Sequence, residues 1–283
     1  MKSRVALLML APALGFYLLT FAAPIIVVGR LSFFQSNYVL ETFVGLRNYH
    51  DAVRDLFYLR SFVNAFLFVA LIVPALIVVS YTTASVLTGF SERIQSVGRF
   101  MLYVPGLSSG LIMTLVWRWL LQKQGLINGA LVTLGLPGVP WMTEAWWSRV
   151  SIALISLVAG IGGTVILFSA SMHSIPGELR DAAVMDGAND REYRRHIVRP
   201  LMTPTILLVL LLNIVGIMQM WETMYVLFQS GGPEGAATSP VYEIFMTAFL
   251  FGKQGYAAAK GVLLMVVIAA ILAVKQRVEK WAR

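Results

Sequence analysis

The chain has 283 residues, with 22 Lys and Arg against 14 Asp and Glu, which gives a formal net charge of +8. It is 58% hydrophobic and only 13% charged, with a mean hydropathy of +0.76, whereas soluble globular proteins carry about 25% charged residues. A chain with so few charged residues cannot form a water-exposed surface of the usual polarity. This excludes an ordinary soluble enzyme and a disordered chain. The absence of cysteine excludes disulfides, thiolate metal sites and cysteine nucleophiles.

Six long and nearly charge-free runs recur along the chain, and each can cross a bilayer as a helix of about 20 residues. They predict an all-α, polytopic membrane protein with six transmembrane helices in a single domain, residues 1–283. Lys260 lies early in the last run, where its side chain is expected to reach the membrane interface. The predicted spans are residues 5–29, 61–88, 99–121, 150–173, 204–228 and 256–275.

The basic residues predict the orientation of these spans. With the N-terminus in the cytoplasm, most Lys and Arg residues fall in inner segments, as the positive-inside rule requires, and both termini lie inside. Lys2 and Arg4 precede the first run as in a signal peptide, but the run is longer than a signal core of about 7–15 residues and is expected to remain. The tryptophans near the outer interface form the expected aromatic belt: Trp117, Trp119, Trp141, Trp146, Trp147 and Trp221.

The fourth span contains the segment AGIGGT. The pairs Ala159/Gly163 and Gly160/Thr164 place small residues four positions apart, a spacing that lets two helices approach closely in lipid. We expect these pairs to form a packing surface within the bundle rather than a ligand site.

The longest inner loop (residues 174–203) predicts two short helices. The first is expected to end at Gly187, where a helix C-cap takes a left-handed residue. Leu179, Ala182 and Ala183 share one face of this helix at i, i+3 and i+4 spacing. Such a small apolar face is suited to docking into a groove on another protein.

Asn189 and Glu192 have the spacing of a capping box for the second helix of this loop. Arg199–Pro200 is expected to end that helix, because the residue before proline disfavours helical backbone. One face of the helix is basic, and attraction to anionic lipid is its simplest explanation. The residues of this face are Arg191, Arg194, Arg195 and Arg199.

The segment ELRDAAVMDGA (178–188), followed by Pro200, resembles the EAA loop of binding-protein-dependent ABC importers. Asp181 departs from the motif, which has glutamate there, and Arg199 replaces a hydrophobic residue. The similarity extends over about residues 5–277. Four further segments resemble the carbohydrate-type branch, which includes maltose and sn-glycerol-3-phosphate permease subunits: FVGLRNY (43–49), SFVNAFLF (61–68), GGP (231–233) and GYAAAKGVLL (255–264).

This resemblance implies a type I ABC importer permease in a bacterial or archaeal cytoplasmic membrane, and not an enzyme. It implies a second permease subunit in a heterodimer, two ATPase subunits that bind ATP and Mg²⁺, and an extracytoplasmic solute-binding protein for a sugar-type solute. The chain itself is expected to bind membrane lipid but no cofactor, metal or nucleic acid. In this family the loop docks on the ATPase, which assigns coupling to Glu178, Leu179, Asp181, Ala182, Ala183, Asp186, Gly187 and Pro200.

Other polar residues are candidates for the solute pathway. Polar groups inside a span are costly and usually face a bundle interior, and sugars suit amide, hydroxyl and aromatic partners. Hydrogen bonding between helices is the competing explanation for each residue. The main candidates are Asn64, Asn213, Gln219, Trp221 and Glu222. The fifth span also offers Thr223, and hydroxyl residues of the second and third spans that could contribute are Thr82, Thr83, Ser85, Ser108 and Ser109.

Three alternatives stay open from the sequence. The chain lacks the GxxxxGK[ST] phosphate loop, so an ATP-driven mechanism needs a partner ATPase. An ion-coupled secondary transporter would instead use Glu222 as a proton site. A non-transporting scaffold or sensor would move no solute, and an ABC permease for a non-sugar solute would share every feature of the inner loop.

Overall fold

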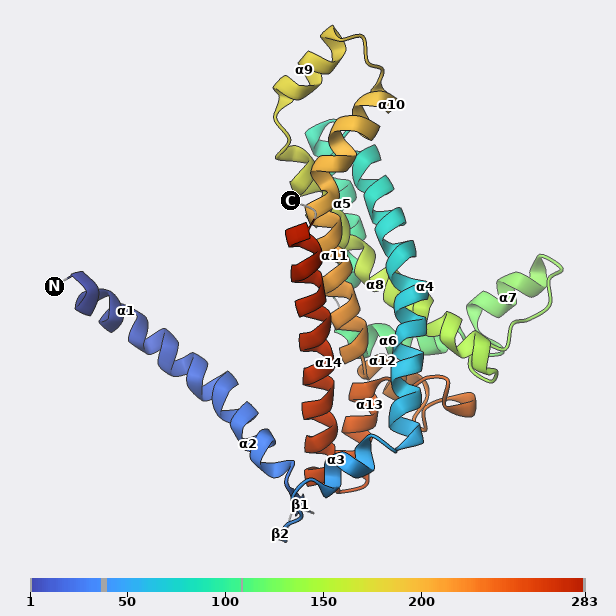
Figure 1. Cartoon of the computed structure of the whole chain (residues 1–283). Coiled ribbons are helices and arrows are strands. Elements are labelled where there is room, and N and C mark those ends of the chain that lie inside the picture. Colours follow the sequence, from blue (N-terminus) through green and yellow to red (C-terminus); the bar gives the residue numbers. More distant parts are fainter. Residues whose placement is uncertain (1, 37–39, 108, 282–283) are drawn as a thin grey trace. The chain divides into compact units, whose positions relative to one another are not determined.

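Figure 1 shows the computed structural model of the chain, which describes residues 2–36, 40–107 and 109–281. The described residues are mostly helical, which confirms the all-α prediction. The exception is a hairpin that the sequence did not indicate, in which β1 (Phe34–Ser36) and β2 (Glu41–Phe43) pair antiparallel. The chain divides into two compact units, residues 1–61 with 240–283, and residues 62–239.

Five helical segments of the described chain are long and apolar enough to cross a membrane. A sixth span is formed if α5 (Glu92–Leu107) and α6 (Gly110–Leu120), which meet at a bend of 89°, are counted together. The structure therefore agrees with six spans, one of them broken. The five continuous segments are Met9–Leu31, Leu56–Leu87, Ala145–His173, Asp190–Gln219 and Gln254–Arg277.

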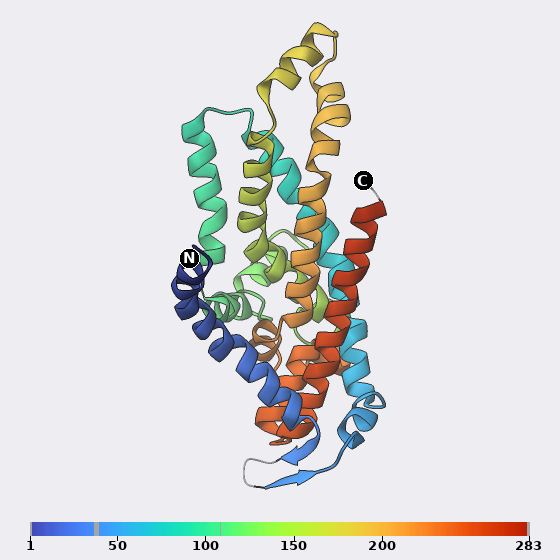
Figure 2. The ribbon, with the colours of Figure 1, turned by 60° about the vertical axis from the view of Figure 1, so that its left-hand side comes forward.

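The unit of residues 62–239 contains most of α4 (Leu56–Leu87) and packs it with α8 (Ala145–His173) and α11 (Arg199–Gln219). Figure 2 shows α4, α5, α8 and α11 running side by side. Their shared core is a cluster of fully buried side chains, on which Tyr81 packs edge-on against the Phe168 ring. The cluster comprises Ala84, Val165, Phe168, Met202 and Val209.

Helices α5 and α8 cross closely at Gly162. A Cβ atom on Gly162 would overlap the backbone carbonyl oxygen of Leu102 and lie 2.6 Å from the Cα atom of Tyr103, so only glycine fits. A Cβ atom on Gly163 would lie in open space, with no neighbouring atom within 4 Å. Of the predicted pair, Ala159 does lie at this crossing, since its carbonyl oxygen would be 3.1 Å from a Cβ on Gly106, whereas Gly163 does not, because α5 meets the neighbouring face of α8.

The remaining elements of this unit connect the long helices. Two short helices were not predicted: α7 (Leu126–Thr133) and the single turn η3 (Pro233–Gly235). In Figure 1, α9 (Gly177–Met185) and α10 (Asp190–Tyr193) lie together at one end of the unit. The π-helical turn η2 (Arg194–Val198) and the short α12 (Glu222–Leu227) precede and follow α11.

The other unit is formed by the two ends of the chain. Its first part contains α1 (Lys2–Tyr17), η1 (Leu18–Ala22), α2 (Ala23–Leu31), the hairpin and α3 (Arg47–Ala52). Its second part contains α13 (Pro240–Phe245), η4 (Met246–Leu250) and α14 (Gln254–Trp281). A Cβ on Gly255 would overlap the carbonyl oxygen of Phe34, so α14 begins in close backbone contact with β1.

Lys260 on α14 is buried, with 2% of the residue exposed. Its Nζ atom lies 2.8 Å from a carboxylate oxygen of Asp55 and donates to Oγ1 of Thr247 at 3.1 Å. It also lies 4.7 Å from the ring centroid of Tyr256 and 5.2 Å from that of Tyr58. We name these five residues the Lys260 cluster. The predicted reach to the interface was wrong, because the carboxylate and the rings replace the water that the ammonium group would otherwise seek.

Asp55 precedes α4 and acts as its N-terminal cap. Its Oδ1 atom accepts hydrogen bonds from the backbone N–H groups of Phe57 and Tyr58 at 3.0 and 3.2 Å. Burial raises the pKa of the Asp55 carboxyl, but the hydrogen bonds from Lys260 and Tyr58 and the charge of Lys260 outweigh it and hold the pKa below its ordinary value. Asp55 is therefore ionised at neutral pH and completes a buried ion pair.

Candidate functional site

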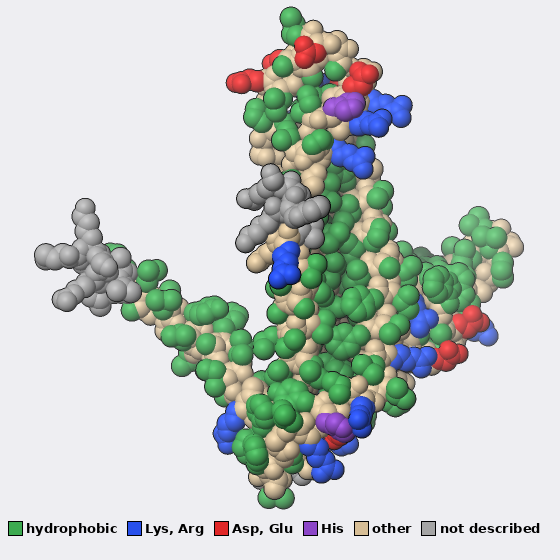
Figure 3. All heavy atoms as spheres, viewed as in Figure 1, with side chains coloured by type: hydrophobic (Ala, Val, Ile, Leu, Met, Phe, Trp, Pro, Cys, Tyr) green, Lys and Arg blue, Asp and Glu red, His purple; other side chains and the backbone are tan. Residues whose placement is uncertain are grey.

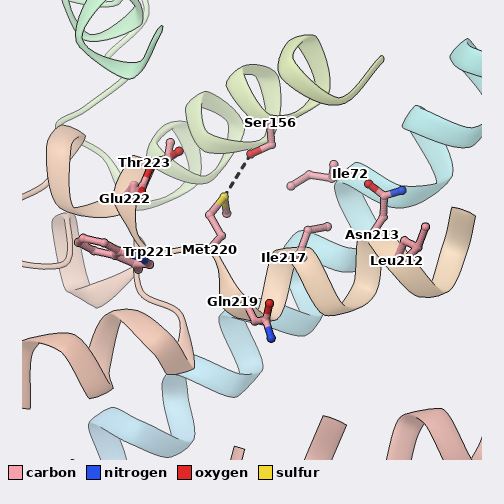
Figure 4. Close-up of a pocket in the computed structure, with 11 residues that line it drawn as sticks. Ile72, Ser156, Leu212, Asn213, Ile217, Gln219, Met220, Trp221, Glu222 and Thr223 are labelled. Carbon is pink, nitrogen blue, oxygen red and sulfur yellow. Dashed lines mark hydrogen bonds between the residues drawn. The ribbon is translucent and has the colours of Figure 1, made fainter. Parts of the chain in front are cut away.

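A cavity of about 370 Å³ opens where α11 ends and α12 begins (Figure 4). The backbone leaves the helix at Met220, which is extended, and resumes helical geometry at Glu222. Irregular backbone at membrane depth is tolerated where it lines a cavity and its polar groups find partners. The lining residues are Ile72, Ser156, Leu212, Asn213, Gly216, Ile217, Gln219, Met220, Trp221, Glu222 and Thr223.

Side-chain contacts hold this break in place. The Ser239 hydroxyl donates to the carbonyl oxygen of Met220, which the helix no longer satisfies. The Ser156 hydroxyl, from α8, donates to the Met220 sulfur at 3.3 Å, the bond drawn in Figure 4. The cavity therefore has one wall of non-helical backbone that is fixed from two directions.

The structure brings four of the five main pathway candidates to this cavity: Asn213, Gln219, Trp221 and Glu222. Asn64 lies elsewhere in the same unit, where its Nδ2 atom donates to the Gly235 carbonyl and to Thr238 Oγ1, each at 2.8 Å. Arg149 donates to its Oδ1 atom at 3.3 Å. Asn64 thus anchors the loop after α12, which is the interhelical role that competed with a solute contact.

The hydroxyl candidates of the second and third spans that the structure describes are not among the residues that line the cavity. Thr82 donates to carbonyl oxygens of its own helix, and Ser85 accepts a hydrogen bond from Arg194. Ser109 is the residue before α6, and Ser108 lies outside the described residues. Thr223, a further candidate of the fifth span, also lines the cavity, whereas sequence reasoning missed Ser156. Ser156 lies on α8, and only the fold places it opposite the candidates of the fifth span.

Glu222 supplies the charge of the cavity. Among the described residues that line it, Glu222 is the one carboxylate, and none is Lys, Arg or His. A Cβ on Gly110 would lie 3.1 Å from the Glu222 carboxylate, so this glycine leaves room for the group at the N-terminal end of α6. The positive end of a helix favours a negative charge there.

The inner loop has the two predicted helices. The first ends where Gly187 adopts a φ of +80°, as expected for a left-handed C-cap residue. Asn189 Oδ1 accepts from the backbone N–H groups of Arg191 and Glu192, and Glu192 Oε2 accepts from the N–H of Asn189 at 2.9 Å. The capping box is therefore confirmed.

The apolar face of α9 differs from the prediction. Ala183 is buried, with 6% exposed, and the chain turns back after this helix so that the N–H of Ala188 bonds to the Ala183 carbonyl oxygen. Val184 and Met185 are the strongly exposed apolar side chains at the end of this helix. The other predicted coupling residues are exposed: Glu178, Leu179, Asp181, Ala182, Asp186, Gly187 and Pro200.

The second helix of the loop does not end at Arg199–Pro200, as predicted, but continues from Asp190 to Gln219. Within η2 the N–H of Arg199 bonds to the carbonyl oxygen of Arg194, five residues earlier, so the turn is wider than an α-helical turn. Pro200 then occupies an early position of α11, where its missing N–H is tolerated. The loop and the fifth span therefore share one helix.

Comparisons with known proteins agree with this organisation. Residues 44–283 match the family described as binding-protein-dependent transport system inner membrane component. The chain is 28% identical over 272 residues to the arabinooligosaccharides transport system permease protein AraP of Bacillus subtilis, covering 95% of this chain and 87% of that one. It is 25% identical to the trehalose/maltose transport system permease protein MalF of Thermococcus litoralis, covering 100% and 96%.

The fold also matches a solved structure. A chain from a bacterial ABC transporter involved in the import of the acidic polysaccharide alginate superposes with a TM-score of 0.85 at 20% identity, covering 99% of this chain and 96% of that chain. At that identity the match is evidence only for the fold, which is the type I importer permease fold. With a family match over residues 44–283, the chain belongs to the inner-membrane components of binding-protein-dependent transport systems.

Proposed function

We propose that this chain is one of two permease subunits of an ATP-driven importer for a carbohydrate. The observation that carries the proposal is the cavity at the α11–α12 break, where amide, hydroxyl and indole groups gather in a membrane-embedded unit. The sugar systems of the relatives AraP and MalF support the solute class. A second permease subunit would complete the pathway, a binding protein would deliver the solute outside, and two ATPase subunits would bind ATP and Mg²⁺ inside.

The charge of the cavity favours an uncharged sugar. A carboxylate accepts strong hydrogen bonds from sugar hydroxyls, and the amides of Asn213 and Gln219 both donate and accept. An acidic solute would meet the Glu222 carboxylate without a cation among the described lining residues to offset it. We therefore propose a neutral oligosaccharide, in contrast to the acidic polysaccharide imported by the structural neighbour.

Glu222→Gln is expected to lower the uptake of a neutral oligosaccharide about tenfold, because charge-assisted hydrogen bonds to its hydroxyls are lost. The measurement is uptake of labelled arabinotriose into proteoliposomes that contain the assembled importer and its binding protein. Glu234→Gln, which removes an exposed carboxylate of the same unit outside the cavity, is the matched control and should leave uptake unchanged. Equal uptake by both variants would exclude Glu222 from the pathway.

We also propose that residues 174–203 couple this chain to the ATPase, with both termini in the cytoplasm. Support comes from the position of α9 and α10 at one end of the unit and from the exposure of most residues of the EAA-like segment. Met185, at 87% exposure, is the most accessible apolar side chain that α9 offers to a partner. The continuous helix Asp190–Gln219 joins this loop to the cavity.

Gly187→Val is expected to abolish ATP-driven uptake while the chain still inserts into the membrane. A β-branched residue resists the φ of +80° at this position, so the turn between α9 and α10 must change. Gly177→Ala is the control, since Gly177 lies in the same loop with an ordinary φ and open space. The measurement is uptake alongside the ATPase rate, and normal uptake by Gly187→Val would contradict the coupling assignment.

One reconstitution separates this function from the alternatives. Uptake that requires ATP and the partner ATPase supports the importer, whereas uptake by this chain alone that a protonophore abolishes supports a secondary transporter. An absence of flux under both conditions would support a scaffold or sensor. Membership of the binding-protein-dependent family favours the first outcome.

A further inference from the structure

The π-turn η2 places two arginines together. In a regular α-helix, residues five apart point to nearly opposite sides, because successive residues turn by about 100°. Here the N–H of Arg199 bonds to the carbonyl oxygen of Arg194, so these residues stand one turn above the other. π-Turns of this kind recur at functional sites, and this one changes which basic side chains share a face.

The Arg194 side chain contacts the C-terminal end of α4. Nη1 of Arg194 donates to Oγ of Ser85 at 3.0 Å, and the charges of Arg199 and Arg194 both act on the Tyr81 hydroxyl. Tyr81 is itself fixed on the packed core of this unit by its contact with Phe168. One guanidinium group therefore contacts this end of α4, and the second lies close enough for its charge to act on Tyr81.

Nearby carboxylates do not neutralise this pair in the described part of the chain. Asp190 lies 3.7 Å from Arg180, and Glu192 is engaged in the capping box with Asn189. Neither carboxylate forms an ion pair with Arg194 or Arg199. Two neighbouring guanidinium groups repel each other, so their arrangement is most favourable when an anion lies between them.

Exposed apolar side chains lie on the same stretches of α4 and α11 as Ser85 and Arg199. Val86, next to Ser85, is 58% exposed, and Leu201, two residues after Arg199, is 48% exposed. Figure 3 shows blue Lys and Arg side chains gathered around α10, above the green apolar surface of the long helices. An anion that binds here would have its charged group on the arginines and apolar surface beside it, which matches a phospholipid and not a free ion.

We propose that Arg194 and Arg199, with Ser85 and Tyr81, form a binding site for the phosphate group of an anionic phospholipid. Guanidinium groups bind phosphate oxygens in a bidentate manner, and the Tyr81 hydroxyl can donate a further hydrogen bond. This site differs from general positive-inside attraction, because it is saturable and depends on two of the four arginines of the basic face.

The test measures binding of spin-labelled phosphatidylglycerol to the full chain in phosphatidylcholine vesicles. Binding should saturate for the wild-type chain, and Arg194→Gln/Arg199→Gln should weaken it about tenfold, as expected when charge-assisted hydrogen bonds are lost. Arg191→Gln/Arg195→Gln removes the same charge from the same helix and should retain saturable binding. Ser85→Ala, which removes no charge, should weaken binding about threefold by releasing Arg194.

Three results would overturn the proposal. Equal loss in the two double variants would mean that the arginines attract lipid only through their summed charge. Displacement of phosphatidylglycerol by inorganic phosphate would identify a free anion as the ligand. Loss of lipid binding in the assembled importer, when the ATPase subunits are present, would assign the arginines to a contact with that protein.

Discussion

Gly162→Ala is expected to destabilise the folded chain by about 3 kcal/mol, the upper end of the cost of inserting a methyl group into a packed core. The added Cβ would overlap the Leu102 carbonyl oxygen and crowd the Tyr103 Cα atom. Both obstacles are backbone atoms, so no side-chain rotation relieves the overlap and α5 must move away from α8. The measurement is the thermal unfolding midpoint of the purified chain in detergent, with the yield of membrane-inserted protein as a second readout.

Gly163→Ala is the matched control for this prediction. Gly163 is the next residue of the same helix, and no atom lies within 4 Å of its Cβ position. Alanine should be neutral or slightly stabilising there, because it favours helix over glycine by about 1 kcal/mol. If both variants unfold at the same temperature, the close crossing of α5 and α8 does not limit stability.

Lys260→Met is expected to have the second large effect, a loss of about 3 kcal/mol at neutral pH. It leaves the Asp55 carboxylate, whose side chain is 19% exposed, without its counter-ion. Asp55→Asn/Lys260→Met should recover part of the loss, because neither charge then remains unpaired. The measurement is a double-mutant cycle of unfolding free energies, and additive losses would contradict a direct interaction.

The pH dependence gives a second test of the Lys260 cluster. In the wild-type chain the pKa of Asp55 is lowered, so its stabilisation is present above the unfolded value of about 3.9 and is lost only as the pH falls through the folded pKa. Wild-type stability from this group should therefore be flat between about pH 5 and 8. In Lys260→Met the hydrogen bond and the charge of the lysine no longer lower the pKa of Asp55, so this pKa rises relative to the wild type and the variant should be less destabilised at low pH.

Glu243 contributes to the pH profile of both proteins. Burial raises the pKa of its carboxyl group, the largest effect, and the charge of Lys260 acts against it. A comparison of Lys260→Met with the double variant removes the effect of Lys260 on the pKa of Glu243, because both variants lack the lysine. A pH-dependent difference between these two variants then reports on Asp55 together with the effect of its charge on Glu243, whose pKa that charge also raises.

The sequence predicted the spans and the caps of the inner loop because both depend on local pattern. A charge-free run or a capping box such as Asn189/Glu192 is complete within a few residues. The pathway candidates of the fifth span were also near one another in the chain, and they meet at one cavity. Ser156 joins them from α8, which no local pattern indicates.

The errors arose where distant residues determine the outcome. Lys260 looked like an interfacial lysine because its partner, Asp55, lies on the other end of the chain. Gly162 and Gly163 are equivalent in sequence, and only the side on which α5 crosses separates them. Arg199–Pro200 looked like a helix end because the wider turn that accommodates the proline has no clear signature in sequence.

The continuous helix from Asp190 to Gln219 has a mechanical consequence. Its 30 residues make a rod of about 45 Å at about 1.5 Å per residue. One end of the rod stands in the inner loop, and the other ends at the cavity beside Met220. A tilt of about 5° about one end moves the far end by about 4 Å. A small rotation imposed on the loop, as the proposed coupling requires, would therefore reach the cavity as a displacement of about 4 Å.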